Sequence, residues 1–198
     1  MPTLRHAIAA DAAQIREIYG PIVVETATSF ELEVPSVEEI RSRIERVQGR
    51  APWLVCEEGG TVLGYAYAAS FRARAAYAWS VESSVYVRPE HQRRGIARAL
   101  YTALFELLRL QGFHRVIAGA TLPNDPSVAF HESFGFTHAG QFRDVGNKFD
   151  TWHTVGFWEL ELQPLGDSPR APRTMDEIVE SEAWNEALRA GEALLSPR

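Results

Sequence analysis

The chain has 198 residues, of which 45 % are hydrophobic and 23 % are charged, a composition typical of one globular domain with an appendage and unlike that of a fibrous protein. Its formal net charge of −6 argues against nonspecific nucleic-acid binding. No apolar run approaches the roughly 20 residues of a membrane span, and the N-terminus lacks the apolar segment of a signal peptide. The single cysteine, Cys56, cannot form an internal disulfide, so we expect a cytoplasmic protein without membrane or nucleic-acid partners.

The first half of the chain predicts two helices followed by a hairpin. Asp11 is a good N-cap for the first helix, and Pro21 predicts either a kink or an end to its first part. The second helix ends near Gly49, and the Gly59-Gly60 pair between two β-rich runs is a strong hairpin signal. The predicted helices are residues 12–25 and 35–50, and the predicted strands are residues 3–8, 53–58, 61–71 and 78–87.

The second half contains the longest predicted helix, residues 95–112, whose leucines recur at helical spacing and which ends at Gly112. A shorter helix at 124–135 begins with Asn124 or Asp125 near its cap and Pro126 in its first turn. The remaining predicted strands are residues 114–121, 136–146 and 151–162. This order of elements predicts a mixed α/β fold without the regular alternation of a doubly wound sheet.

The composition changes after Leu162. Residues 163–173 are rich in proline and glycine and read as a linker. Residues 174–198 then form a predicted helical extension, with one helix over 174–196 that packs on the domain or on a partner subunit. The predicted organisation is therefore a domain at 1–162, a linker and an extension.

A basic corner joins the strand at 78–87 to the long helix, in the sequence "VYVRPEHQRRGIARAL". The first amides of a helix have no intrahelical partner and carry partial positive charge. Gly95 allows close backbone approach, and Arg93 and Arg94 add two full charges. The corner fits a phosphate or pyrophosphate cradle, although a solvated basic helix entry explains the same residues.

The spacing Gln92-x-x-Gly95-x-Ala97 resembles the Q/R-x-x-G-x-G/A signature of the GCN5-related N-acetyltransferase (GNAT) family. The segments "PWLVCEEGGTVLGYAYAASF", "HQRRGIARALYTAL", "LPNDPSVAFHESFGF" and "DVGNKFDTWHTVGFWEL" are similar to the phosphinothricin and methionine sulfoximine N-acetyltransferases, with coverage from about Leu4 to about Leu162. The resemblance implies the GNAT fold, a mostly antiparallel central sheet with helices on both faces. It also implies a homodimer. Arg98 departs from the small residue that many relatives carry there.

The resemblance implies acetyl-coenzyme A as the cosubstrate and places it along one continuous path. The loop amides would hold the pyrophosphate, the pantetheine arm would lie along the strand like an added strand, and strand amides would polarise the thioester carbonyl. The residues assigned in this way are Val85, Tyr86, Val87, Gln92, Arg93, Arg94, Gly95, Ile96, Ala97, Arg98 and Asn124, with Ser127 and Ser133 as weaker assignments. Asn124 also reads as a helix cap. No metal site is expected.

Two side chains are candidates for proton transfer. Alternation along the strand places Glu82 on the face opposite Val81 and Ser83, and a carboxylate in a central strand is unfavourable unless it has a partner or a role. The resemblance places a general base at Glu82, while pairing with an arginine such as Arg72 or Arg74 is the structural alternative. His131 stands where many family members have a tyrosine that protonates the thiolate, and a histidine there could act as acid or base.

The acceptor pocket is assigned mainly by resemblance. An arginine can hold a substrate carboxylate with two hydrogen bonds, and aromatic side chains can flank a short aliphatic chain. The assigned residues are Phe30, Arg72, Arg74, Tyr77, Lys148 and Trp152. The predicted reaction is direct acetyl transfer to the amino group of a small amino acid or analogue, because Cys56 is a poor acyl carrier in a strand.

Two alternatives stay open at this point. One is acetylation of a different amine, such as a polyamine, an aminoglycoside or a protein N-terminus. Arg74 and its neighbours favour a substrate with a carboxylate over a polycation. The other is a noncatalytic module that binds acyl-coenzyme A and signals through its tail, which would need neither Glu82 nor His131. Resistance to a herbicide-like or antibiotic-like compound is an expected consequence of the preferred reaction and need not be the native role.

Overall fold

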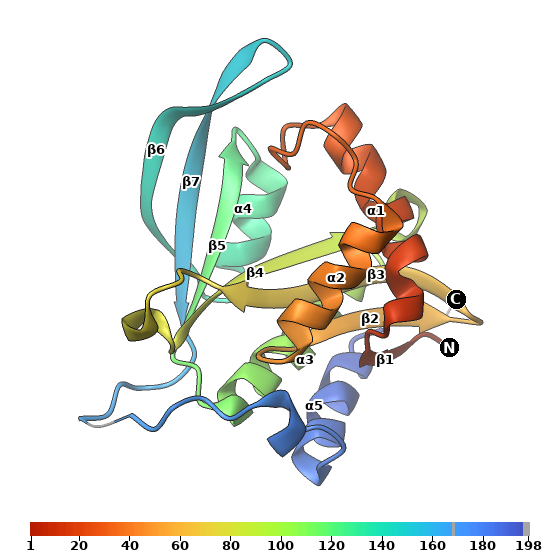
Figure 1. The fold of residues 1–198 in the computed structure, drawn as a ribbon, viewed down its shortest axis with the longest axis vertical. Helices are drawn as coiled ribbons and strands as arrows, with labels where there is room; N and C mark the ends of the chain where they lie inside the picture. Colours follow the sequence, from red (N-terminus) through yellow and green to blue (C-terminus); the bar gives the residue numbers. More distant parts are fainter. Residues whose placement is uncertain (168, 196–198) are drawn as a thin grey trace.

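The computed structural model describes residues 1–167 and 169–195, and its described part contains one seven-stranded sheet with helices on both faces (Figure 1). The strand order is β1-β2-β3-β4-β5-β7-β6, and every neighbouring pair is antiparallel except β4 and β5. The strands are β1 (Thr3–His6), β2 (Trp53–Glu58), β3 (Thr61–Ser70), β4 (Ser80–Val87), β5 (Arg115–Leu122), β6 (Thr137–Lys148) and β7 (Thr151–Glu161). The predicted sheet type is confirmed.

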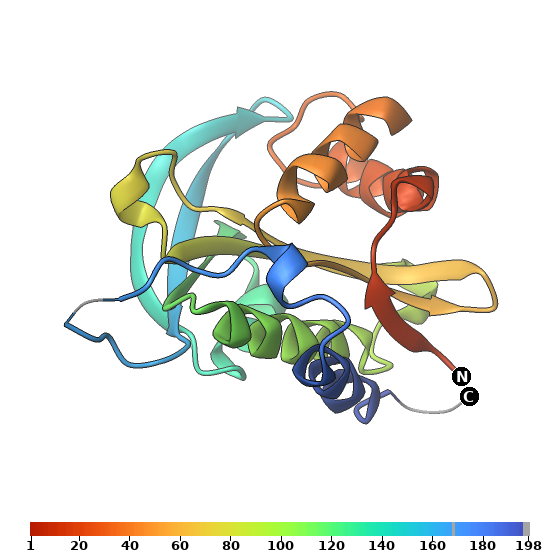
Figure 2. The same cartoon turned by 60° about the horizontal axis from the view of Figure 1, so that its bottom comes forward.

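The helices lie in two layers. One face of the sheet carries α1 and α2, and the other carries α3, with α5 packed outside it (Figure 2). The helices are α1 (Ala12–Glu25), α2 (Val37–Gln48), α3 (Ile96–Gln111), α4 (Asp125–Glu132) and α5 (Glu182–Glu192), and the 3₁₀ turns are η1 (Ala9–Asp11), η2 (Ala75–Tyr77), η3 (Pro89–His91) and η4 (Met175–Glu177). The predicted order of helices and strands is confirmed through β7.

Alternation within the central strands builds two separate cores. In β2, Leu54 and Cys56 face α3, whereas Trp53 and Val55 face α1 and α2. This strand is buried on both faces, which explains why its sequence is a continuous apolar run rather than an alternating one. Cys56 is fully buried, and burial raises the pKa of its thiol to about 12, so the thiolate form is strongly disfavoured.

Turn chemistry follows the sequence closely. Gly59 and Gly60 have φ angles of 59° and 81° between β2 and β3, as a two-residue hairpin turn requires. Gly112 ends α3 in the left-handed conformation. Pro21 does not end the first helix: it lies on the exposed side of α1, which continues to Glu25.

The single helix predicted over 174–196 is wrong. The chain forms the short turn η4, then a break, and then α5. Glu180 in the break has a φ of 62°, and Ser181 caps α5 by accepting a hydrogen bond from the amide of Trp184. Two segments with different orientations explain why the apolar residues did not form one stripe. Residue 168 of the predicted linker and residues 196–198 of the predicted extension lie outside the described residues.

Among the helices of the described ranges, none combines the length and the apolar character that crossing a bilayer would require.

Candidate active site

The parallel strands β4 and β5 separate part-way along their length. They pair only from Ser80 to Glu82 on β4, opposite Arg115 to Ile117 on β5. Beyond Glu82 the two strands diverge, which is visible in Figure 1. The second half of β4, from Ser83 to Val87, therefore has an edge without a strand partner in the middle of the sheet. Exposed strand edges accept an additional extended segment.

The basic corner after β4 has the backbone shape of an anion site. Arg93 and Gly95 have φ angles of 60° and 80°, so two left-handed residues bend the loop just before α3. Within the described residues, no acceptor is bonded to the backbone amides of Arg93, Arg94 or Gly95. The first turn of α3 adds further amides without intrahelical partners. Free amides on a left-handed bend at a helix N-terminus bind phosphate groups.

Two cavities meet along this edge. One, of about 300 Å³, lies at the loop, and the other, of about 390 Å³, extends along β4 to α4; Val87, Gln92 and Phe130 line both. The longer cavity includes Ser83 from the α3 face of β4 and Ser84 from the opposite face. It therefore passes through the sheet where β4 and β5 separate. Its other lining residues include Thr28, Val85, Tyr86, Arg93, Ala97, Tyr101, Gly119, Asn124, Ser127 and His131.

Glu82 stands at the point where the strands separate. Burial raises the pKa of its carboxyl group, and Arg72 partly opposes this shift through its positive charge. Within residues 1–167 and 169–195, no hydrogen bond or ion pair is formed by the Glu82 carboxylate. Gly119 on β5 lies close to this carboxylate, because an added Cβ there would lie 3.7 Å from Glu82 Oε1. A half-buried carboxylate without a partner and with a raised pKa is suited to general-base chemistry.

His131 belongs to a chain of hydrogen bonds on the other face of β4. Its Nδ1 lies 2.7 Å from the carbonyl oxygen of Ser127, so Nδ1 carries the proton and Nε2 is the acceptor. The hydroxyl of Tyr101 lies 3.4 Å from Nε2, and Ser83 donates to that hydroxyl over 3.2 Å. Burial lowers the pKa of His131, while the bond to Ser127 raises it by a smaller amount. The neutral imidazole is therefore oriented to accept a hydrogen bond from the Tyr101 hydroxyl.

The sequence analysis missed Tyr101 and Gly119. Tyr101 is fully buried in α3, and its position in the apolar stripe of that helix marks it as a core residue. Burial raises the pKa of its hydroxyl well above the usual value, so the hydroxyl stays protonated. The signal that could have identified it is a polar group within an otherwise aliphatic stripe. Gly119 interrupts the apolar pattern of β5, and a glycine inside a strand indicates close approach of another group.

A third cavity, of about 470 Å³, opens on the Glu82 face of the sheet beside the paired part of β4 and β5. The guanidinium of Arg72 lies 5.0 Å from the ring centre of Phe71, and Tyr77 meets the same ring edge-on. The cavity thus combines an aromatic wall with a cation close to Glu82. Its other lining residues are Ser80, Arg115, Ile117, Ala139, Gly140, Gln141, Phe142, Phe157 and Glu159.

The structure brings together most of the predicted cofactor residues. Val85, Tyr86, Val87, Gln92, Arg93, Asn124 and Ser127 line the cavity along β4, and Gly95, Ile96, Ala97 and Arg98 line the loop cavity. Asn124 also caps α4 by accepting from the amide of Ser127, so its amide nitrogen stays available. Two predicted arginines have protein partners, since Arg94 contacts His91 and Arg98 donates to Ser133. Ser133 lies outside the lining of both cavities.

The predicted acceptor residues do not form one cluster. Arg72 and Tyr77 line the third cavity, whereas Arg74 is exposed at the start of η2 and lines no described cavity. Phe30 packs against Gly146 of the β6–β7 hairpin, and Trp152 on that hairpin is 63 % exposed. The remaining residue, Lys148, is buried, and its ammonium donates to the carbonyl of Val23 in the last turn of α1 and to that of Ser29 in the α1–α2 connection.

Residues 4–154 match the acetyltransferase (GNAT) domain family. The chain belongs to the GNAT acetyltransferase family. Among its GNAT relatives, the phosphinothricin N-acetyltransferase of Streptomyces viridochromogenes is 43 % identical over 175 residues, which is 88 % of this chain and 95 % of that protein. The L-methionine sulfoximine/L-methionine sulfone acetyltransferase of Salmonella typhimurium is 37 % identical over 81 % of this chain and 94 % of its own length.

A solved GNAT structure supports the same assignment. The phosphinothricin acetyltransferase of Sinorhizobium meliloti, in complex with acetyl-coenzyme A, superposes with a TM-score of 0.80 at 32 % identity. The match covers 88 % of this chain and 98 % of that one. The GNAT fold implied by the sequence resemblance is therefore confirmed. In the described ranges, no group of three or more His, Cys, Asp or Glu side chains gathers as a metal site would require.

Proposed function

We propose that this GNAT protein transfers an acetyl group from acetyl-coenzyme A directly to the amino group of a small amino acid or analogue, of the phosphinothricin or methionine sulfoximine type. The observation that carries the proposal is the cavity that passes through the sheet at the split between β4 and β5. On one face of the sheet the cavity reaches His131 and the loop Arg93–Gly95, which we call the anion loop. On the other face it opens close to Glu82. Two substrates can therefore enter from opposite faces and meet at one point.

The residues present fit acetyl-coenzyme A. The free amides of Arg93 to Gly95 and the first turn of α3 suit its pyrophosphate. The unpartnered edge of β4, from Ser83 to Val87, suits the extended pantetheine arm with its two amide groups. When bound, the thioester supplies the activated acetyl group. The backbone amides on this edge would polarise the thioester carbonyl.

Glu82 would take the proton that the acceptor ammonium must lose, directly or through a water molecule. The neutral amine then forms the new C–N bond as the thioester C–S bond breaks, and the nitrogen releases a second proton as the amide forms. The leaving thiolate needs one proton, which the protonated Tyr101 hydroxyl, part of the cavity lining, can deliver by turning from His131 Nε2 to the sulfur. The second proton released by the nitrogen then restores the hydroxyl. Neutral His131 orients that hydroxyl through Nε2. This division of roles makes Glu82 the main base and His131 a positioning residue.

The third cavity supports an amino-acid acceptor. Arg72 can bind a carboxylate or a phosphinate, and the Phe71 and Tyr77 rings suit a short aliphatic chain. A polyamine or aminoglycoside would bring positive charge close to this guanidinium, which disfavours that alternative. The relatives named for phosphinothricin and methionine sulfoximine have the same class of substrate.

The test is release of free thiol from acetyl-coenzyme A with a panel of amines that includes phosphinothricin, methionine sulfoximine, a polyamine, an aminoglycoside and a peptide N-terminus. We expect activity with the two amino-acid analogues. Cofactor binding without thiol release across the panel would instead support the noncatalytic module.

The arginines offer a matched pair for the acceptor site. Arg72→Ala should raise the KM for the amino-acid acceptor about tenfold or more, because it removes a charge-assisted contact. Arg74→Ala should change that KM less, because Arg74 lines no described cavity. A larger increase of that KM in Arg74→Ala than in Arg72→Ala would place the carboxylate site at η2 instead of the third cavity.

We further propose that the protein acts as a cytoplasmic homodimer, with residues 1–162 as the catalytic domain, 163–173 as a linker and 174–198 as an extension. Support for the dimer comes from exposed apolar side chains on the β6–β7 hairpin, including Phe142 and Trp152. Sedimentation of the purified protein at the monomer mass would contradict it.

Cell fractionation tests the compartment, and growth on phosphinothricin with and without the gene tests resistance.

A further inference from the structure

The C-terminal extension follows α3 from its last residue to the loop that precedes it (Figure 2). At the far end of α3, Arg173 and Gln111 exchange two hydrogen bonds: the Arg173 amide donates to the Gln111 carbonyl over 2.7 Å, and Gln111 Nε2 donates to the Arg173 carbonyl over 2.8 Å. At the near end, Leu194 reaches Gly95. Arg173, the last residue of the linker, and the extension that follows it therefore contact opposite ends of the helix whose N-terminus has the backbone shape of an anion site.

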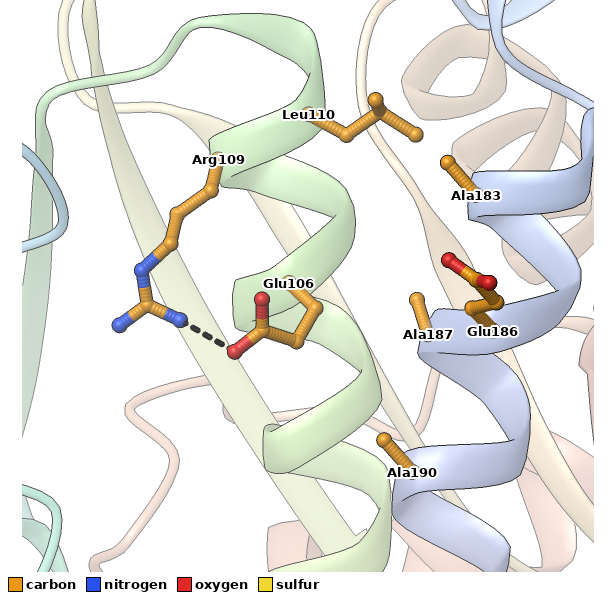
Figure 3. Close-up of a pocket in the computed structure, with 7 residues that line it drawn as sticks. All are labelled: Glu106, Arg109, Leu110, Ala183, Glu186, Ala187 and Ala190. Carbon is orange, nitrogen blue, oxygen red and sulfur yellow. Dashed lines mark hydrogen bonds and ion pairs between the residues drawn. The ribbon is translucent and has the colours of Figure 1, made fainter.

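Small residues allow α5 to approach α3 closely. Ala183, Ala187 and Ala190 face α3 across a shallow groove, as Figure 3 shows. At Gly191 the two helix backbones approach each other closely, because an added Cβ would lie 2.5 Å from the carbonyl oxygen of Ala99. This contact is one turn of α3 away from Gly95. Any side chain at position 191 would push the end of α5 away from the start of α3.

The end of the extension packs directly against the anion loop. An added Cβ at Gly95 would lie 2.6 Å from the carbonyl oxygen of Leu194, so only a hydrogen fits between the two backbones. Glu192 fixes this end to β1 by accepting the amide of Leu4 over 2.8 Å, and Leu195 packs on the main core. The loop is thus held between the open cavity on one side and the extension on the other.

We propose that the segment Ala193–Leu195 positions the anion loop for coenzyme A, with the Leu194 carbonyl as the contact that holds Gly95 in its left-handed conformation. The inference rests on the proposed function, because it concerns the same coenzyme A site. A loop without this support would sample conformations in which its free amides no longer converge on one point. Part of the binding free energy would then be used to restore the loop.

In this arrangement, coenzyme A binding and the packing of the extension against α3 are thermodynamically linked. If the extension strengthens coenzyme A binding, coenzyme A must stabilise the docked extension by the same factor. Couplings between sites in proteins change affinity by about 5- to 150-fold. We expect the lower end here, about fivefold, because the extension supports the loop without contacting the ligand cavity.

The first experiment compares the full chain with a chain ending at Ala193 and a control chain ending at Leu195. Titration calorimetry measures coenzyme A binding, and steady-state kinetics separates KM from kcat. We expect the chain ending at Ala193 to bind coenzyme A about fivefold more weakly and to show a raised KM for acetyl-coenzyme A. Its kcat and its KM for the acceptor should stay within about twofold of the full chain. The control should match the full chain.

The outcomes distinguish the two proposals. If the full chain itself fails to bind coenzyme A, the proposed function is overturned. If all three chains bind it equally, only the role of the extension is overturned. If the chain ending at Ala193 folds poorly, kcat and the kcat/KM values for both substrates would fall together. The second experiment, with variants of the full-length chain, covers that case.

The second experiment keeps the extension and shifts it. Gly191→Ala displaces α5 from Ala99, whereas Gly166→Ala, which meets no atom within 4 Å, is the matched control. Hydrogen exchange of the Leu194 and Leu195 amides, which bond to Gly191 and Glu192 carbonyls, should slow when coenzyme A is added to the control. In Gly191→Ala that slowing should disappear and coenzyme A should bind more weakly. Slowing of equal size in both variants would contradict the proposed coupling.

Discussion

On the α3 face of β4, the polar groups are bonded in a chain from Ser83 through Tyr101 and His131 to the Ser127 carbonyl. On the opposite face, one residue away, the Glu82 carboxylate has no hydrogen-bond or ion-pair partner among the described residues. The first face fixes geometry, and the second leaves a charged group available for reaction. A strand with side chains alternating across a sheet can therefore hold an oriented proton donor and a free base side by side.

The largest effect is expected on the unpartnered face. Glu82→Gln should lower kcat/KM by about 10²- to 10⁴-fold, because it removes the proposed general base. Thermal stability should be unchanged or higher, because a desolvated carboxylate is lost. Steady-state kinetics and thermal melting measure the two effects. Glu106→Gln, an exposed residue paired with Arg109 on α3, is the matched control. Near-normal activity in Glu82→Gln would show that the carboxylate on this face takes no part in the reaction.

The hydrogen-bonded face should show a smaller loss of rate. Tyr101→Phe should lower kcat by about tenfold or more, because it removes the proposed proton donor to the thiolate and the contact to His131. The free energy of unfolding should fall by about 1 kcal/mol, the net contribution of one buried hydrogen bond. Tyr65→Phe, a buried tyrosine on the opposite face, is the control. Equal kcat in the two variants would show that the Tyr101 hydroxyl serves only packing.

The two faces should also respond differently to pH. Because burial raises the pKa of Glu82, kcat/KM should fall on acidification at a higher pH than a solvent-exposed carboxyl group would produce. Because burial lowers the pKa of His131, the folded state disfavours its protonation. The free energy of unfolding should therefore fall as the pH drops below about 6.5, by at most about 1.4 kcal/mol per pH unit for this one proton. Urea unfolding between pH 8 and pH 5 measures this slope, and His131→Gln should reduce it.

The smallest effect is expected at the buried thiol. Cys56 lies in the core below α3, and its raised pKa disfavours the thiolate that an acyl carrier needs. Cys56→Ala should therefore change kcat by less than about twofold, with a modest loss of stability from the smaller side chain. A loss of activity with the fold intact, measured by circular dichroism, would contradict direct transfer.

Much of this molecule was readable from local patterns. Helical and strand periodicity, the Gly59-Gly60 turn and the corner before α3 depend on neighbours in sequence, and each predicted its element. Glu82 stood out because a carboxylate in an apolar strand conflicts with burial. The prediction of one helix over 174–196 was wrong, because Glu180 adopts a left-handed conformation that no local sequence pattern predicts.

The sequence by itself determined the order of elements, the alternation that separates Glu82 from Ser83, and the anion loop with its family resemblance. These features follow from backbone periodicity and from residue chemistry over short distances. Only the tertiary structure decided where β4 and β5 separate, which hydroxyl faces His131, and that Leu194 lies against Gly95. Those relations join segments up to about a hundred residues apart. They depend on how whole elements pack, and packing has no signature in the spacing of residues along the chain.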